Sequence, residues 1–318
     1  MNTLPYAIGV DVGGTKIAAI LIDRQGEILA RSFALVPPEP TSDKVVELCA
    51  EAVREVQGAR LPDDIAGVGL AIPGFIDVGQ QRILRCVNLP LEACDMQAQM
   101  QEALGLPVVM DNDATLAMLG EARYGAARGV MHALMLTLGT GVGGGLLIGG
   151  ELYHGARGLA GEVGHTVIVA GGDLCPCGGR GHLESYLGRE ALARRARDAA
   201  RTPEGAGILS AAGGVISAIS AETLLDAADA GDRCADRILR EAGELLGLAL
   251  VTFVNLLAPE SIIIAGGLGE RAPQLIDAAR DRLETERPPG IVDLTVACGA
   301  LGNDAGAFGA GALAFDRA

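Results

Sequence analysis

The sequence has no apolar run long enough to span a bilayer, and no basic N-terminus precedes an apolar core. We therefore expect neither a membrane segment nor a secretory leader. Its seven cysteines are an odd number without a regular spacing, so we expect no disulfide framework either. Together these absences predict a cytoplasmic protein in a reducing compartment.

Positive charge is also scarce. Lysine and arginine together number 25, against 40 aspartates and glutamates, which gives a net charge of −15. Lysine occurs only at Lys16 and Lys44, a bias that we attribute to a GC-rich genome. Such an acidic chain is not expected to bind nucleic acid through a broad basic surface. It can still bind ATP if backbone amides and a magnesium ion neutralise the phosphates.

The 318 residues, 49% of them hydrophobic, suffice for two domains or one large domain with an ample core. Apolar runs that end at glycine or proline predict strands, and amphipathic stretches predict helices. The expected strands are 7–10, 17–22, 26–35, 65–72, 107–110, 132–138, 146–148, 261–265 and 292–297, and the expected helices are 43–57, 114–124, 183–200, 221–230, 232–257 and 304–314.

Four potential zinc ligands lie close together in the middle of the chain. Cys175 and Cys177 occupy a Gly- and Pro-rich loop, with His165 ten residues before the first and His182 five residues after the second. Thiolate and imidazole are the ligands of tetrahedral zinc. A disulfide between cysteines so close in sequence would be strained. The four side chains therefore predict a closed, structural zinc site, with His154 and Glu184 as rival ligands.

A Gly-rich turn joins the first two expected strands, and its sequence is Asp11-Val-Gly-Gly-Thr-Lys16. Glycines permit a tight turn whose amides point at an anion. Asp11 could hold magnesium through water, and Thr15 and Lys16 could contact phosphate oxygens. It is not a Walker loop, because threonine precedes lysine and a strand follows. A plain Gly-rich hairpin is the alternative.

A second turn of this kind, Gly139-Thr-Gly-Val-Gly-Gly144, joins two later strands. It fits the dinucleotide pattern G-x-G-x-x-G, but that fold requires a helix where this chain has a strand. The likeness of the two turns suggests a duplicated domain. Each half would contribute one phosphate-binding hairpin, and the two would face each other across a cleft.

Three other positions lie where strands of α/β sheets end, and ligands commonly bind there. Gly74 follows the strand expected at 65–72. Asp113 begins a helix, either as its N-cap or as a general base. Gly266-Gly267 follows a later strand, and glycines there would let a flat group such as adenine lie on the backbone.

These motifs resemble those of the ROK family (repressors, open reading frames and kinases), sugar kinases with an actin-like, hexokinase-like ATPase fold. The resemblance covers nearly the whole chain. One departure is His182, where the family usually has a third cysteine; imidazole is an acceptable ligand, so we expect the site to persist. The resemblance rests on the two Gly-rich turns, Ile264-Ala-Gly-Gly267, Asn112-Asp113, Gly161-Glu-Val-Gly-His165 and Cys175-Pro-Cys-Gly-Gly-Arg-Gly-His-Leu-Glu184.

The resemblance implies an α/β fold class with two actin-like, ribonuclease-H-like domains around a cleft, each with a mixed sheet flanked by helices. Residues 1–113 with 304–318 would form the first domain, and residues 114–303 the second. It further implies a homodimer or homotetramer, with no nucleic acid and no membrane among its partners.

The implied activity is that of an ATP-dependent hexose kinase, which converts glucose and ATP to glucose 6-phosphate and ADP. Asp113 would take the proton from the 6-hydroxyl of the sugar, and ATP, Mg²⁺ and structural Zn²⁺ would be the cofactors. The implied sugar-binding residues are Gly74, Asn112, Asp113, Glu162, His165 and Glu184; those that bind ATP or its phosphates are Asp11, Gly13, Gly14, Thr15, Lys16, Gly139, Thr140, Gly141, Gly266 and Gly267; and the zinc ligands are His165, Cys175, Cys177 and His182.

Three alternatives stay open at this point. The sugar could be N-acetylmannosamine or N-acetylglucosamine, since the contact residues are of the same types. Polyphosphate could replace ATP as the donor. A sugar-responsive repressor of the same family is the alternative of a different class. It would need a DNA-binding domain before the first phosphate motif, and we expect none, because that motif begins at Asp11.

Overall fold

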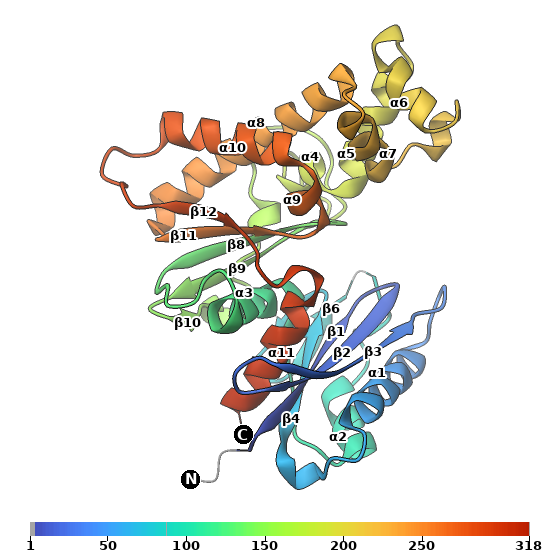
Figure 1. The fold of residues 1–318 in the computed structure, drawn as a ribbon, viewed down its shortest axis with the longest axis vertical. Helices are drawn as coiled ribbons and strands as arrows, with labels where there is room; N and C mark the ends of the chain where they lie inside the picture. Colours follow the sequence, from blue (N-terminus) through green and yellow to red (C-terminus); the bar gives the residue numbers. More distant parts are fainter. Residues whose placement is uncertain (1–3, 87, 318) are drawn as a thin grey trace. The chain divides into compact units, whose positions relative to one another are not determined.

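Two mixed five-stranded sheets, each flanked by helices, form the protein, which confirms the expected α/β fold class (Figure 1). The computed structural model describes residues 4–86 and 88–317. Contacts divide the chain into two units, Met1–Met135 with Gly145–Gly161 and Gly299–Ala318, and Leu136–Gly144 with Glu162–Cys298. The domain division expected from the sequence stays a prediction, and its residues 1–3 and 318 lie outside the described part.

The first sheet has the strand order β3-β2-β1-β4-β7. β1 (Tyr6–Val12) and β2 (Lys16–Asp23) form an antiparallel hairpin, and β3 (Ile28–Leu35) continues it. β4 (Ile65–Ile72) runs parallel to β1, and β7 (Val108–Asn112) runs parallel to β4. A small hairpin of β5 (Phe75–Asp77) and β6 (Arg82–Arg85) follows β4.

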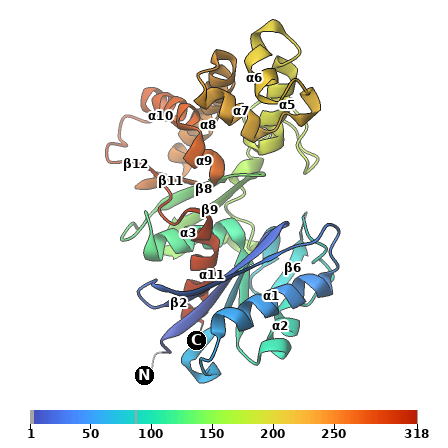
Figure 2. The same ribbon diagram turned by 45° about the vertical axis from the view of Figure 1, so that its right-hand side comes forward.

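Helices cover both faces of this sheet. α1 (Ser42–Gln57) and α2 (Met96–Leu104) lie on one face, and α11 (Ala305–Asp316) lies on the other (Figures 1 and 2). Large apolar side chains such as Ile8 pack beneath α1 and α2 in one buried cluster. α3 (Asp113–Tyr124) packs beside α11.

The α11 face is built from small residues. A β-carbon on Gly69 of β4 would lie 1.9 Å from the carbonyl oxygen of Ala310, and one on Gly309 would lie 1.7 Å from that of Leu116 in α3. Backbone therefore packs directly on backbone here, which only glycine permits. α11 thus packs against β1, β4 and α3 within the first unit.

The second sheet has the strand order β10-β9-β8-β11-β12. Its strands are β8 (Ala133–Leu138), β9 (Val142–Ile148), β10 (Glu151–Leu152), β11 (Ser261–Ala265) and β12 (Thr295–Cys298), and the boundary between the two units crosses β8 and β9.

Two long helices, α8 (Arg233–Leu257) and α10 (Pro273–Glu286), pack against each other, as Figure 1 shows. Among the described residues, no helix is both long enough and apolar enough to cross a membrane. The shorter helices are α4 (Glu184–Leu187), α5 (Arg189–Ala199), α6 (Ala206–Ala211), α7 (Ala221–Asp229) and α9 (Gly267–Arg271), and 3₁₀ turns occur at Pro62–Asp64, Gly155–Arg157, Val163–His165, Pro203–Gly205, Ile216–Ala218 and Gly302–Asp304.

The single helix expected over 183–200 is wrong, because the chain forms α4 and α5 with extended backbone at Gly188 between them. The amide of Arg189 donates to the carbonyl of Gly139 at 3.1 Å, so the break lets the chain hydrogen-bond to the second Gly-rich turn. The strand expected at 292–297 begins only at Thr295. The β5–β6 hairpin, α2 and α6 were not expected from the sequence pattern.

We expect the variant Gly309→Val to lower the free energy of unfolding by about 3 kcal/mol, the upper end for an overpacked core, because backbone stands in the way of the new side chain. Urea unfolding followed by circular dichroism measures this. Gly290→Val is the matched control, since a β-carbon at Gly290 meets nothing within 4 Å. Equal midpoints for both variants would contradict the close packing of α11.

Candidate functional site

Strands β1, β4 and β7 of the first sheet are parallel, so their carboxyl ends lie side by side. We call this end of the strands the carboxyl edge of the sheet. The register places Asp11 of β1 opposite Ala71 of β4, and Ala71 opposite Asp111 of β7. Carboxyl ends of parallel strands are the usual ligand-binding edge of an α/β sheet. The fold thus brings Asp11, Gly74, Asn112 and Asp113, which lie far apart in sequence, to the same edge.

The first Gly-rich turn lies at this edge, between β1 and β2. The amide of Gly13 donates to the carbonyl of Lys16 at 2.9 Å, which closes the turn. Gly14, Thr15 and Lys16 are exposed. The Lys16 ammonium lies 5.1 Å from the centroid of the Phe33 ring. The expected role of this turn in phosphate binding stays a prediction.

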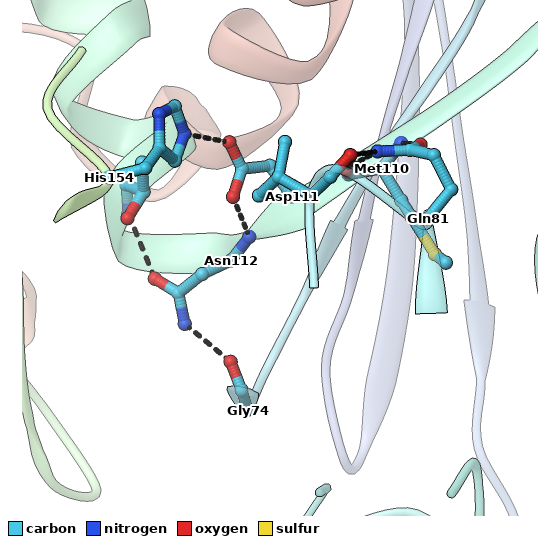
Figure 3. Close-up of polar contacts among 8 residues, drawn as sticks. Gly74, Gln81, Met110, Asp111, Asn112 and His154 are labelled. Atoms are coloured by element: carbon cyan, nitrogen blue, oxygen red, sulfur yellow. Dashed lines mark hydrogen bonds and ion pairs between the residues drawn. The ribbon is translucent and has the colours of Figure 1, made fainter. Parts of the chain in front are cut away.

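Asn112 connects two parts of the edge. Its Nδ2 donates to the carbonyl of Gly74 at 2.9 Å (Figure 3). Its Oδ1 accepts from the amide of Thr115 at 3.0 Å. Gly74 has φ +139°, and a β-carbon there would lie 2.1 Å from the carbonyl oxygen of Arg85, so only glycine fits. The Asn112 side chain is thereby held at both ends.

The N-cap of α3 is Asn112 and not Asp113, so the cap interpretation of Asp113 is wrong. Asp113 is the first helical residue, and its Oδ1 accepts from the amide of Ala114 at 2.8 Å. Burial raises the pKa of the Asp113 carboxyl to about 6, although hydrogen bonds to its charged form oppose the shift. Such a group can exchange a proton near neutral pH.

A second carboxyl at this edge is also perturbed. Burial and, to a smaller extent, the charges of Asp113 and Asp304 raise the pKa of Asp11 to about 7, and the charge of Lys16 opposes this shift. Carboxylates that repel one another in a buried place retain protons unless a cation offsets their charge. This corner of the first unit is therefore electrostatically suited to a bound cation.

Asp111 and His154 form a pair that the sequence reading did not place in the site. Asp111 is 1% exposed, and its Oδ2 lies 2.6 Å from Nε2 of His154. The Oδ1 of Asp111 accepts from the amide of Asn112 at 2.7 Å (Figure 3). His154 is thus outside the zinc cluster, and the rival assignment of this residue as a metal ligand is wrong. No local motif signals the pair.

Gln81 is a second residue that the sequence reading missed. Its Oε1 accepts from the amide of Met110 at 2.7 Å, and its Nε2 donates to the carbonyl of Met110 at 3.1 Å (Figure 3). Because β7 is the edge strand of the first sheet, its outer backbone groups lack a neighbouring strand. The Gln81 amide takes the place of that strand immediately before the residues of the site.

The second Gly-rich turn lies in the second unit, between β8 and β9. The amide of Gly139 donates to the carbonyl of Gly141 at 3.0 Å. A β-carbon on Gly188 would lie 3.0 Å from the carbonyl oxygen of Thr140, so the start of α5 packs closely on the turn. The turn is held from outside as well as by its own hydrogen bond.

The fold brings this turn next to the expected adenosine motif. Gly266 has φ +87°, and a β-carbon there would lie 2.4 Å from the carbonyl oxygen of Leu138, directly before the turn. A β-carbon on Gly267 would lie 3.1 Å from a guanidinium nitrogen of Arg189. Arg189 pairs with Glu222 at 2.8 Å, and the sequence reading missed both residues because only tertiary packing brings them here.

The four expected zinc ligands come together in the second unit. One ligand atom from each of His165, Cys175, Cys177 and His182 lies within 4.8 Å of the other three. Sγ of Cys175 is 3.8 Å from Nδ1 of His165, and Sγ of Cys177 is 3.2 Å from Nδ1 of His182. Bonds of about 2.0–2.3 Å place tetrahedral zinc ligands roughly 3.3–3.8 Å apart, so the donor set fits that ion.

The zinc loop is connected to residues outside it. Nε2 of His165, the nitrogen away from Cys175, lies 3.7 Å from a carboxylate oxygen of Glu162. Oε1 of Glu184 accepts from the Cys175 thiol at 3.7 Å, and its Oε2 accepts from the amide of Val142 at 3.0 Å. The Glu184 carboxylate therefore joins the zinc loop to the second Gly-rich turn.

Comparison with known proteins agrees with this arrangement. The chain is 36% identical to a glucokinase of Streptomyces coelicolor over 313 residues, which cover 96% of each chain. It is 27% identical to a xylose repressor of Bacillus spizizenii, and the match covers 98% of this chain and 77% of the repressor. The crystal structure of a ROK family glucokinase from Streptomyces griseus in complex with glucose and AMPPNP is similar, with a TM-score of 0.85, 33% identity, and coverage of 97% of this chain and 98% of that one.

The model of the ROK family matches residues 7–317, which is almost the entire sequence. The Gly-rich turns and the cysteine–histidine loop all lie within this match. This chain belongs to the ROK family.

Proposed function

We propose that the protein is an ATP-dependent hexose kinase that converts glucose and ATP to glucose 6-phosphate and ADP. The observation that carries the proposal is the placement of Asp113, a carboxyl with a pKa near neutrality, beside Asn112 at the carboxyl edge of the first sheet. The Streptomyces coelicolor relative is a glucokinase, and the Streptomyces griseus relative was crystallised with glucose and AMPPNP.

In the proposed reaction, Asp113 accepts the proton of the sugar 6-hydroxyl. The hydroxyl oxygen forms a bond to the γ-phosphorus, and the bond from that phosphorus to the oxygen of the leaving ADP breaks. Phosphoryl transfer requires mainly positioning, charge neutralisation and a placed base. A base with a pKa of about 6 is largely ionised at neutral pH and still accepts a proton as the hydroxyl loses it.

The phosphates of ATP would meet the two Gly-rich turns. In the first unit, the amides of Gly13 and Gly14 and the side chains of Thr15 and Lys16 would contact phosphate oxygens. Asp11 would hold Mg²⁺ through water, and the ion, when bound, offsets the charge of the phosphates. In the second unit, Gly139, Thr140 and Gly141 would contact phosphate, and Gly266 and Gly267 would lie against adenosine.

The sugar hydroxyls would meet residues from both units. Gly74, Asn112 and Asp113 would contribute from the first, and Glu162, His165 and Glu184 from the second. Zinc, when bound, would fix the ring of His165 through Nδ1 and leave Nε2 directed toward Glu162, since ligation of one nitrogen fixes the hydrogen bond of the other. The metal would thus shape sugar binding without contacting phosphate.

We expect Asp113→Asn to lower kcat by roughly 10²-fold or more, the usual contribution of a placed base, while sugar affinity is largely kept. The amide retains the size of the side chain but cannot take the proton. Steady-state kinetics, with sugar binding measured by calorimetry, separates the two effects.

The pH profile provides a second readout of the same variant. In the parent protein, kcat/KM should rise with pH as the Asp113 carboxyl loses its proton near pH 6, and the variant should lack this limb. Asp198→Asn, at an exposed position on α5, is the control and should behave as the parent. Near-normal turnover in Asp113→Asn would refute its role as the base.

A further prediction concerns which sugar and which phosphoryl donor the protein prefers. Because the expected contact groups are small and polar, we expect glucose with magnesium ATP to give the highest kcat/KM in a panel of hexoses and N-acetylhexosamines. ADP release and transfer of labelled phosphate are measured separately, with ATP and with polyphosphate. A much higher kcat/KM for N-acetylmannosamine would disprove the glucose assignment and leave the kinase assignment standing.

Another prediction concerns the zinc content of the protein. Protein that has never met a chelator should contain about one equivalent of zinc by elemental analysis, since a closed set of four protein ligands retains its ion. Removal of zinc should raise the KM for sugar and leave that for ATP nearly unchanged, because the loop carries His165 and joins Glu184.

Variants identify the ligands. His182→Cys should keep the metal, and His182→Ala should weaken its binding. Cys298→Ser, at an exposed cysteine outside the cluster, is the control and should retain full zinc. Less than about half an equivalent in the parent would count against a structural site. Full zinc in His182→Ala would show that another group completes the ligand set.

A further inference from the structure

The His154–Asp111 pair has no part in the proposed reaction, yet it lies directly behind the residues that do. Asp111 is the residue of β7 before Asn112, and it is 1% exposed. His154 follows β10, about forty positions later in the chain, and its Nε2 lies 2.6 Å from Oδ2 of Asp111. A buried carboxylate is costly unless it is paired and hydrogen-bonded. The contact with His154 therefore offsets the cost of burying the Asp111 carboxylate.

The Asp111 carboxylate binds two groups with its two oxygens. Oδ2 holds the imidazole, and Oδ1 accepts the amide proton of Asn112 at 2.7 Å. The side chain of Asn112 in turn holds the carbonyl of Gly74 and caps α3. One continuous set of hydrogen bonds therefore runs from His154 to the backbone of Asn112, and Asp113 is the next residue (Figure 3).

His154 also holds the chain on its own side. Its carbonyl oxygen accepts from the amide of Ala160 at 3.1 Å, which closes the loop ahead of Gly161. In the same loop, Gly158 has φ +76°, and a β-carbon there would lie 2.7 Å from the carbonyl oxygen of Ile76 in β5. The loop is thus packed close to the chain that follows Gly74, and His154 cannot move far from Asp111 without disturbing it.

The charges around His154 favour its protonated form. The hydrogen bond to Asp111 is the largest influence and raises the pKa of the imidazole above its ordinary value; burial and the charge of Arg317 oppose it. The stabilisation from a raised imidazole pKa is complete below the unfolded value, near 6.5, and is lost as the pH rises through the folded value. The pair is therefore an ion pair at acidic pH and weakens as the medium becomes alkaline.

We propose that His154 is a positioning residue for Asn112 and Asp113, and that it acts through the buried carboxylate of Asp111. This proposal rests on the proposed kinase function. The imidazolium neutralises Asp111 and orients its carboxylate, so that Oδ1 faces the amide of Asn112. The backbone at the end of β7 is then held where Asn112 can contact sugar and Asp113 can reach the 6-hydroxyl.

Kinetics of two His154 variants, with a matched histidine control, test the proposal. His154→Gln removes the cation, and we expect the KM for sugar to rise and kcat to fall by about threefold each, so that kcat/KM falls by about tenfold, less than the roughly 10²-fold that a full 1 Å displacement costs. The KM for ATP should not change. His132→Gln, at an exposed histidine whose Nδ1 only accepts from the amide of Gly149, should match the parent.

The pH profile separates positioning from general stability. In the parent, kcat/KM for sugar should fall as the pH rises through the pKa of His154, and His154→Arg, with a permanent cation, should recover most of the activity and lack this limb. A uniform loss of activity in both variants with an unaltered profile, or loss of thermal stability alone, would overturn the proposal.

A measurement without catalysis keeps failure of this proposal distinct from failure of the kinase assignment. Only four histidines occur, so the ring resonances of His154 can be resolved by NMR and followed as the pH changes. The amide resonance of Asn112 should shift with the titration of His154, and Asp111→Asn should abolish this link. An Asn112 amide that ignores His154 would refute the proposal, even in an active kinase. Coupling in a protein that phosphorylates no hexose would uphold the hydrogen-bonded path and refute the kinase assignment on which the proposed role rests.

Discussion

The approach of α11 to the first sheet depends on positions where any β-carbon would strike backbone. Gly9 and Gly69 allow α11 to pack closely on β1 and β4. Gly120 and Gly309 allow it to pack closely on α3. α3 begins with Asp113, so the packing that seats α3 also seats the proposed base. A single helix of small residues thus locates the edge at which β1, β4 and β7 end.

Glu121 reinforces this arrangement with charge. It is fully buried in α3, where its Oε1 accepts from the amide of Leu301 and its Oε2 from the amide of Ala126. A buried carboxylate is stable only with such partners, and these two amides belong to the segments that follow α3 and precede α11. The helix pair is therefore fixed by a polar contact as well as by close packing.

The sequence predicts the parts of the site whose chemistry is local. The Gly-rich turns and the cysteine–histidine cluster are short patterns, and the structure brings together the ligand atoms that the spacing suggested. Local patterns do not identify Gln81 and His154, which lie in other loops and hydrogen-bond to residues of β7. Nothing in their neighbouring residues marks them, because their hydrogen bonds to β7 form only once the chain has folded.

Helix boundaries show the same limit. The sequence alone favours one continuous helix from 183 to 200 in spite of Gly188, but tertiary hydrogen bonding breaks the helix at that glycine. The amide of Arg189 has a partner in Gly139, which a continuous helix would deny it. Local propensity is a weak preference that a few specific contacts outweigh.

In each unit, one carboxylate hydrogen-bonds both to a side chain and to a backbone amide. In the second unit, Glu184 accepts from the thiol of Cys175 and the amide of Val142. In the first, Asp111 joins the imidazole of His154 to the amide of Asn112. A carboxylate has two oxygens and accepts several hydrogen bonds, so it can hold a side chain with one oxygen and the main chain with the other. One oxygen of each carboxylate binds a side chain and the other binds a backbone amide. A change in the side-chain partner therefore alters the position of the carboxylate and, through it, that of the backbone amide. Deprotonation of the His154 imidazole would therefore loosen the backbone at Asn112, next to a proposed substrate contact, whereas the contact between Cys175 and Glu184 lasts only while the thiol keeps its proton and is replaced when the thiolate binds zinc.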